Sequence, residues 1–246
     1  MLISAMVGID SRATMDIDIT LRNYPLNCES AEQIVRQIAD VEIDDKISFV
    51  IKKTEEIMED SEYQGVRLSL DAYLDKTRIP LKIDISTGDV ITPCEISFSY
   101  QLMFENRTIP LLAYPPETVL AEKLETILSR GEANTRLRDF YDVYILQRED
   151  FVVTPDALRY ALLATCRTRG HEDLLHTYAS ILDGVRQSDA MRTQWMKYQT
   201  DFDYAAGITW DTVLDTVETL CMKTLDDHAF GDELPQEESQ FEMHLL

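Results

Sequence analysis

The spacing of the apolar residues changes once along this chain, close to Tyr114 and the two prolines that follow it. Before this point several segments alternate apolar and polar residues, which is typical of strands with one buried face. After it, apolar residues recur every three or four positions, which is typical of amphipathic helices. The sequence therefore predicts an α/β domain over residues 1–112, an all-helical domain over 113–225 and a tail over 226–246.

Both regions divide further into expected elements. A helix is predicted over 30–41, where Ala31, Ile34, Val35 and Ile38 have helical spacing. The predicted strands are 15–21, 46–52, 66–73, 80–85 and 95–103. The predicted helices of the second region begin at Pro116 and continue over 138–147, 155–167, 171–182, 191–198 and 210–222. The expected fold class is therefore α/β (α+β), followed by helices alone.

The overall charge restricts what the surface can bind. The chain carries 45 acidic and 23 basic residues, a net charge of −22. Such a surface repels nucleic acid in general, so a nucleic-acid substrate would have to bind a local basic patch. The acidic residues of 232–242 are expected to form a solvated tail or, alternatively, to bind a basic partner.

The chain has no sequence signal for a membrane. No apolar run approaches the roughly 20 residues that a membrane-spanning helix needs. Residues 1–7 are apolar but lack the basic leader of a signal peptide. We therefore expect a cytoplasmic protein.

Two carboxylates in the first predicted strand point to a metal site. Asp16 and Asp18 are two residues apart, so their side chains lie on the same face of a strand. Like charges this close repel unless a cation lies between them, and oxygen donors suit Mg²⁺. Asp84 occupies a similar place in the apolar segment 81–85. Three such carboxylates could hold two metal ions that activate a hydroxyl and stabilise leaving pyrophosphate.

A simpler interpretation of these carboxylates remains open. In a chain with 45 acidic residues, two aspartates on one strand face are common, and they can be solvated surface groups. The residues of the second region therefore help to decide between a metal site and solvated surface carboxylates.

In that region, Lys123 lies between apolar Leu120 and Leu124, close to the apolar stripe of its helix. Lys123 could contact a triphosphate as a point charge, or it could belong to an ordinary solvated face. Asp139 and Asp142 share one helix face because they are three residues apart. This acidic face could orient Lys123 or a metal-bound water, or it could only cap and solvate the helix.

Four short motifs occur in order along the first 147 residues. They are Arg12-x-Thr14-x-Asp16-x-Asp18, Leu81-Lys82-Ile83-Asp84-Ile85, Pro116-Glu117 through Ala121-Glu122-Lys123-Leu124, and Arg138-Asp139-x-x-Asp142. Together they resemble the AbiEii/AbiGii nucleotidyltransferase toxin family, a branch of the polymerase-β-like nucleotidyltransferases. The resemblance implies a nucleotidyltransferase domain with a mixed sheet, followed by a helical domain.

The resemblance also implies an activity and its partners. Proteins of this family are toxins of bacterial toxin–antitoxin or abortive-infection systems. They bind a nucleoside triphosphate with Mg²⁺ (or Mn²⁺), and some transfer nucleotides to the 3′ end of tRNA. A cognate antitoxin is then an expected partner of this chain, although the two can be partners only in the genetic sense.

Site residues carry over from the family by position. Asp16 and Asp18 would hold metal, and Asp84 would be the third carboxylate, as a ligand or a general base. Lys123 would contact the triphosphate, and Asp139 would be the essential acidic residue of the last motif. The further candidates for substrate binding are Arg12, Thr14, Arg130 and Arg138.

The chain departs from the family in one respect. The family carries a Gly-Gly or Gly-Ser turn ahead of the helix before the metal strand, and its backbone N–H groups hold the triphosphate. The only nearby glycine is Gly8, which comes too late. We therefore expect a nucleotidyltransferase chain that is either truncated or has lost this turn, which leaves open whether it is active as an enzyme. The alternative function is a non-catalytic paralogue that binds a nucleotide or a partner.

Overall fold

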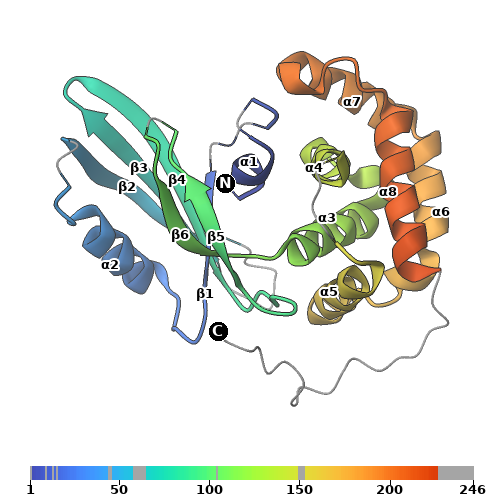
Figure 1. Ribbon diagram of the computed structural model, residues 1–246, viewed down its shortest axis with the longest axis horizontal. Helices are drawn as coiled ribbons and strands as arrows, with labels where there is room; N and C mark the ends of the chain where they lie inside the picture. Colours follow the sequence, from blue (N-terminus) through green and yellow to red (C-terminus); the bar gives the residue numbers. More distant parts are fainter. Residues whose placement is uncertain are drawn as a thin grey trace. The chain divides into compact units, whose positions relative to one another are not determined.

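The computed structural model describes residues 2–8, 10–12, 14, 16–43, 46–57, 65–103, 105–148 and 153–226 (Figure 1). The chain forms two compact units, one of residues 1–91 with 96–113 and the other of residues 92–95 with 114–246. The predicted boundary at residues 112 and 113 lies next to this division. Of the predicted tail, only Asp226 lies within the described residues.

Unit 1 is built on a four-stranded mixed sheet with the strand order β1-β4-β3-β2. Strand β1 (Asp16–Leu21) runs parallel to β4 (Thr77–Thr87). Strand β3 (Gly65–Leu74) is antiparallel to β4 on one side and to β2 (Ile47–Ile57) on the other. The predicted mixed α/β fold class is therefore confirmed.

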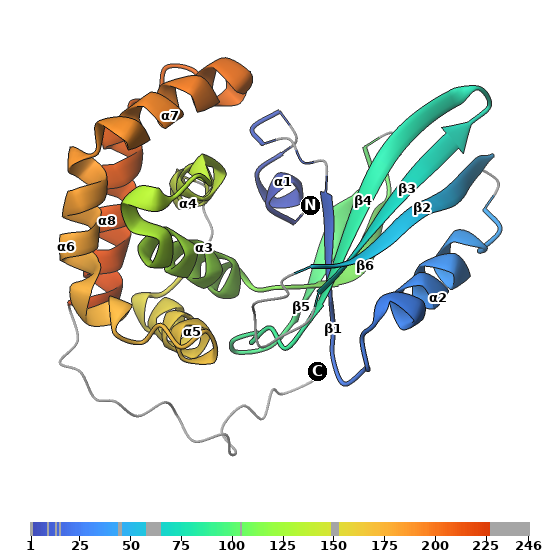
Figure 2. The ribbon, with the colours of Figure 1, turned by 180° about the vertical axis from the view of Figure 1, so that it is seen from behind.

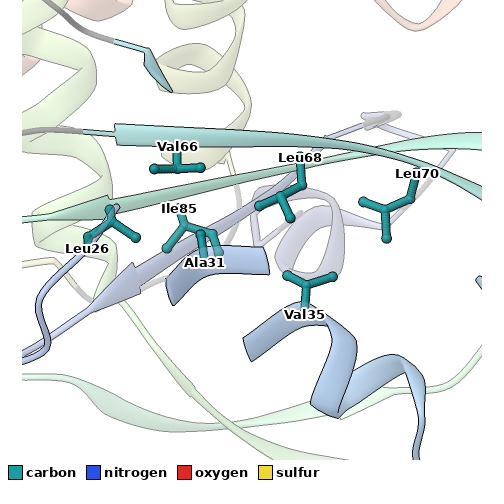
Figure 3. Packing of buried hydrophobic residues seen from close by; sticks show 7 residues of the cluster. All are labelled: Leu26, Ala31, Val35, Val66, Leu68, Leu70 and Ile85. Carbon is teal, nitrogen blue, oxygen red and sulfur yellow. The ribbon is translucent and has the colours of Figure 1, made fainter. Parts of the chain in front are cut away.

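Helix α2 (Cys28–Ala39) covers one face of this sheet, as Figures 1 and 2 both show. It begins with a capping box, because the Asn27 side chain accepts from the Ser30 N–H at 2.8 Å and the Ser30 hydroxyl accepts from the Asn27 N–H at 3.0 Å. Figure 3 shows the core between helix and sheet, formed by Leu26, Ala31, Val35, Val66, Leu68, Leu70 and Ile85.

The opposite face of the sheet carries polar side chains. Along β3, Leu68 is fully buried under α2, whereas its neighbours Arg67 and Ser69 are half-buried. Successive side chains of a strand point to opposite faces, so these two neighbours lie on the face away from α2. The alternation of the sequence therefore separates an apolar face from a polar one.

Two elements of unit 1 differ from the sequence-based expectation. The predicted strand 46–52 continues to Ile57, because the pairing shifts at a bulge between Ile51 and Lys53. Strand β6 (Thr108–Ala113) pairs with β5 (Ile96–Gln101) and was not predicted, because its proline argues against a strand. Helix α1 (Leu2–Val7) does not follow from the spacing of apolar residues, but the family resemblance implies a helix before the metal strand, and α1 lies there.

Unit 2 consists of helices, as predicted. Helices α5, α7 and α8 each begin where a serine or threonine side chain caps the first turn, namely Thr154, Ser188 and Thr209. No helix in the described part of the chain is long and apolar enough to cross a membrane. The helices are α3 (Pro116–Arg130), α4 (Leu137–Arg148), α5 (Pro155–Thr168), α6 (Leu174–Gln187), α7 (Asp189–Asp201) and α8 (Trp210–Leu225).

A buried carboxylate joins α3 to the end of α5. The Glu125 side chain is 3% exposed and contacts the guanidinium of Arg169 and, at 2.7 Å, Nδ1 of His171. Buried charges of this kind persist only where partners replace the lost water. Glu125 therefore anchors the segment that follows α5.

Candidate functional site

The predicted metal carboxylates lie on the polar face of the sheet in unit 1. In the parallel pairing of β1 and β4, Asp18 is the register partner of Asp84, and Asp16 is the partner of Lys82. Residues in register have side chains on the same face, and Asp16 shares that face with Asp18. The sheet thus brings Asp84 beside a carboxylate 66 positions earlier in the chain.

Asp84 is bonded to an arginine that the sequence did not single out. On β3, Arg67 is the register partner of Asp84. Its Nε and Nη2 donate to the two carboxylate oxygens of Asp84 at 2.7 and 2.6 Å, a bidentate arrangement. The hydrogen bonds to Asp84 raise the pKa of Arg67, against the opposing effect of burial, and the charges of Asp16 and Glu55 add to the rise.

The donor types of this face fit a hard divalent cation, but the carboxylates are not assembled around one place. Carboxylate oxygens are the ligands that Mg²⁺ prefers in proteins. Among the residues that the structure describes, no three His, Cys, Asp or Glu side chains are grouped closely enough to hold a metal ion.

A second charged cluster lies in unit 2, between α3 and α4. The Lys123 ammonium is 2.6 Å from Oδ1 of Asp139 and 3.3 Å from Oδ2 of Asp142. The two carboxylates are 1% and 0% exposed, and the lysine side chain is 17% exposed. Arg136 adds a second cation, with Nε 2.8 Å from Oδ2 of Asp139. The acidic face of α4 therefore orients Lys123, one of the alternatives left open by the sequence.

The cluster keeps Lys123 protonated. Burial by itself lowers the pKa of this lysine, but the adjacent charges of Asp139 and Asp142 outweigh burial and raise it above its ordinary value. A lysine in this state is a fixed positive charge. It can bind an anion, but it is not a base near neutral pH.

The remaining candidates of the first motif, Arg12 and Thr14, contact residues close to them in the sequence. Arg12 is buried, with Nη1 3.5 Å from the Ser4 hydroxyl of α1. The Thr14 hydroxyl donates to the backbone oxygen of Asp16 at 3.3 Å. Both contacts stabilise the entrance to β1, and a role of either residue in binding phosphate stays a prediction.

The two arginine candidates of the helical unit lie apart from the Lys123 cluster. Arg138 places its guanidinium 5.4 Å from the centre of the Phe202 ring, in cation–π geometry. Arg130 is exposed in the last turn of α3, about 10 Å along the helix axis from Lys123. Contacts of these arginines with a substrate therefore stay predictions.

Sequence reasoning missed Arg67 and Arg136. Arg67 interrupts the apolar residues Val66 and Leu68 in an alternating segment, which indicates the polar face but not the partner. The partner follows only from the pairing of β3 with β4. Arg136 lies three residues before Asp139, a spacing typical of helix-side pairs, although α4 begins one residue later.

Comparisons with known proteins agree with the resemblance of the motifs. The sequence model of the family described as nucleotidyl transferase AbiEii toxin, type IV TA system, matches residues 1–216. No curated protein matches the chain. Among solved structures, JHP933 from Helicobacter pylori is similar with 14% identity and a TM-score of 0.43, over 92% of this chain and 84% of its own. A candidate nucleotidyltransferase from Helicobacter pylori is similar with 10% identity and a TM-score of 0.39, over 90% and 86%.

The family match extends over more than four fifths of the chain and includes all four motifs. The two structural likenesses are distant, so the assignment rests on the family match. The chain therefore belongs to the AbiEii nucleotidyl transferase toxin family.

Proposed function

We propose that this chain transfers a nucleotide from a nucleoside triphosphate to an RNA acceptor, with Mg²⁺ or Mn²⁺ as the cofactor. The acceptor that the family suggests is the 3′ end of tRNA, and the biological role is that of a toxin with a cognate antitoxin. The observation that carries the proposal is the polar sheet face, where β1 and β4 present Asp16, Asp18 and Asp84 on one side.

In this proposal the residues of unit 1 act on the cation and the acceptor hydroxyl. Asp16 and Asp18 hold the divalent cation, and Asp84 completes the carboxylate set as a ligand or as the base for the attacking hydroxyl. When bound, the cation supplies charge stabilisation for the reacting phosphate and the leaving pyrophosphate. The apolar face under α2 keeps these strands in register, and so keeps the three carboxylates on one face of the sheet.

The residues of unit 2 act on the charge of the triphosphate. Lys123 contacts the triphosphate as a protonated ammonium, consistent with its raised pKa. Asp139 is a positioning residue, because it holds the lysine at 2.6 Å. Asp142 adds a second carboxylate to the same ammonium.

The test is a label-transfer assay with this chain, Mg²⁺, labelled NTPs and total tRNA. We expect label on tRNA with the native chain and loss of label with Asp16→Asn, which keeps the shape but removes a charge. The matched control is Glu56→Gln on β2, which is exposed and lies in register with the buried Val66, on the apolar face of the sheet. Transfer that survives Asp16→Asn would rule out the proposed cation site.

One observation favours the alternative, a non-catalytic protein that binds a nucleotide or a partner. Both oxygens of Asp84 accept a hydrogen bond from Arg67, so the charge of the third carboxylate is already balanced by a cation of the chain. Calorimetric titration with a non-hydrolysable NTP and Mg²⁺ separates the two functions. Binding without label transfer to any RNA would favour the non-catalytic protein, and binding with transfer favours the enzyme.

A further inference from the structure

On the polar face of the sheet, a cation of the chain itself stands beside the third carboxylate. The guanidinium of Arg67 meets Asp84 with two hydrogen bonds, and both residues belong to central strands of the sheet. Their positions follow from the register of β3 and β4, not from flexible loops. The pair is therefore a built feature of this face.

Arg67 is attracted by more than one carboxylate. Besides Asp84, the charges of Asp16 on β1 and Glu55 on β2 act on this guanidinium. A cation placed among several carboxylates relieves their mutual repulsion, which is also what a divalent cation does. The guanidinium thus supplies part of the positive charge that balances the carboxylates of this face.

The exposure of the pair allows an exchange. The Arg67 side chain is 37% exposed and that of Asp84 is 20% exposed. Water can compete for a pair that reaches solvent, so such a pair is easier to separate than a fully buried one. The Lys123 cluster differs, since its two carboxylates are almost completely buried.

We infer that Arg67 is an internal counter-ion that competes with the divalent cation for Asp84, so that the third carboxylate joins the metal site only after this arginine has released it. The inference rests on the proposed function, because it takes the face of Asp16, Asp18 and Asp84 as the cation site. The site then has two states, one in which Arg67 neutralises Asp84 and one in which the divalent cation replaces the guanidinium at this carboxylate.

The experiment measures Mn²⁺ binding to the full chain without nucleotide, from the electron paramagnetic resonance signal of free Mn²⁺. Arg67→Met removes the competitor and is expected to tighten Mn²⁺ binding about three- to fivefold beyond the effect of charge alone. Arg67→Lys keeps the charge but loses the two-pronged contact, so an intermediate tightening is expected.

The matched control is Lys82→Met. Lys82 is exposed, lies two residues before Asp84 on the same face of β4 and is in register with Asp16. The structure describes both Lys82 and Asp84 and records no bond between them. This variant therefore reports what the loss of one positive charge does to Mn²⁺ binding. In an Asp84→Asn background, Arg67→Met is expected to tighten binding no more than Lys82→Met does.

The outcomes separate the inference from the proposed function. If Asp16→Asn weakens Mn²⁺ binding but Arg67→Met and Lys82→Met shift it equally, the counter-ion role is wrong and the cation site stands. If Asp16→Asn leaves Mn²⁺ binding unchanged, the cation site is wrong and the inference falls with it. Urea unfolding of each variant checks that it is folded. If Arg67→Met does not fold, Arg67→Lys still tests the inference.

Discussion

Two acidic clusters of this chain each hold a cation of the chain itself, and they differ in burial. The carboxylates of Asp139 and Asp142, which hold Lys123, are almost completely buried. The side chains of Asp84 and Arg67 both reach solvent. Breaking a fully buried pair leaves an uncompensated charge without water, whereas the partners of a half-buried pair can regain water when they separate. For single residues, we therefore expect the Lys123 pair to cost more to break than the Arg67 pair.

The cost of breaking the Lys123 pair can be tested by removing the lysine. Lys123→Met leaves two buried carboxylates without their ammonium, so we expect the free energy of unfolding to fall by about 3–5 kcal/mol in urea titration. Lys123→Arg keeps the charge and should lose less. The triple variant Lys123→Met with Asp139→Asn and Asp142→Asn removes all three charges and should recover much of the loss. A Lys123→Met protein as stable as the native chain would contradict this account.

The charge state of Lys123 predicts how its contribution to the free energy of unfolding depends on pH. Its pKa is raised above the ordinary 10.5, so the protonated form is favoured in the folded chain. The stabilisation is therefore fully present below pH 10.5 and is lost as the pH rises through the folded pKa. We expect the difference in unfolding free energy between native chain and Lys123→Met to be constant from pH 7 to 9 and to shrink above about pH 11. A difference that shrinks already between pH 7 and 9 would show a lowered pKa.

Among the elements, strand β3 contributes to two different faces: one of its faces packs in the apolar core, and the other carries polar side chains. Its alternate residues Val66, Leu68 and Leu70 pack under α2, and the residues between them face the polar side. A slip of one position in the pairing would exchange the two faces. The same alternation that buries the core therefore places Arg67 beside the carboxylates.

Neighbouring positions of β3 should consequently respond in different ways. Leu68→Ala removes a fully buried side chain and is expected to lower the free energy of unfolding by about 2–5 kcal/mol. Ser69→Ala, on the other face, should change it by no more than about 0.5 kcal/mol. Equal losses at the two positions in chemical denaturation would contradict the assignment of the faces.

At the scale of the whole molecule, the dominant property is the net charge of −22. Self-repulsion of this size destabilises a compact state, and it opposes the approach of RNA, another polyanion. The ion pairs that the structure records are local and do not remove this excess. Any RNA acceptor must therefore be held by a limited set of basic residues.

This excess charge predicts a stabilising effect of salt. Raising NaCl from about 10 to about 150 mM shortens the screening length from about 30 to about 8 Å. We expect the midpoint of thermal unfolding, followed by circular dichroism without divalent cations, to rise by about 2–4 °C. Equal shifts with KCl would distinguish screening from binding of one ion. A lower midpoint at higher salt would mean that attractive pairs outweigh the repulsion.

The sequence by itself determined the elements, because their period is a local property of the chain. Alternation predicted β1, β3 and most of β4, and the three- to four-residue spacing predicted the helices from α3 onwards. The order of four motifs indicated the family. Local pattern was insufficient where the pairing is irregular, at the bulge of β2, and where a proline obscures β6.

Only the tertiary structure decided which charges meet. Asp18, Arg67 and Asp84 lie on three strands, and their contacts depend on a register set by the apolar residues on the other face. Lys123 and Asp139 are 16 positions apart, on helices whose packing decides that an acidic face is buried around a lysine instead of solvated. Long-range pairing and burial arise only when the chain packs, so the spacing of residues along the sequence does not predict them.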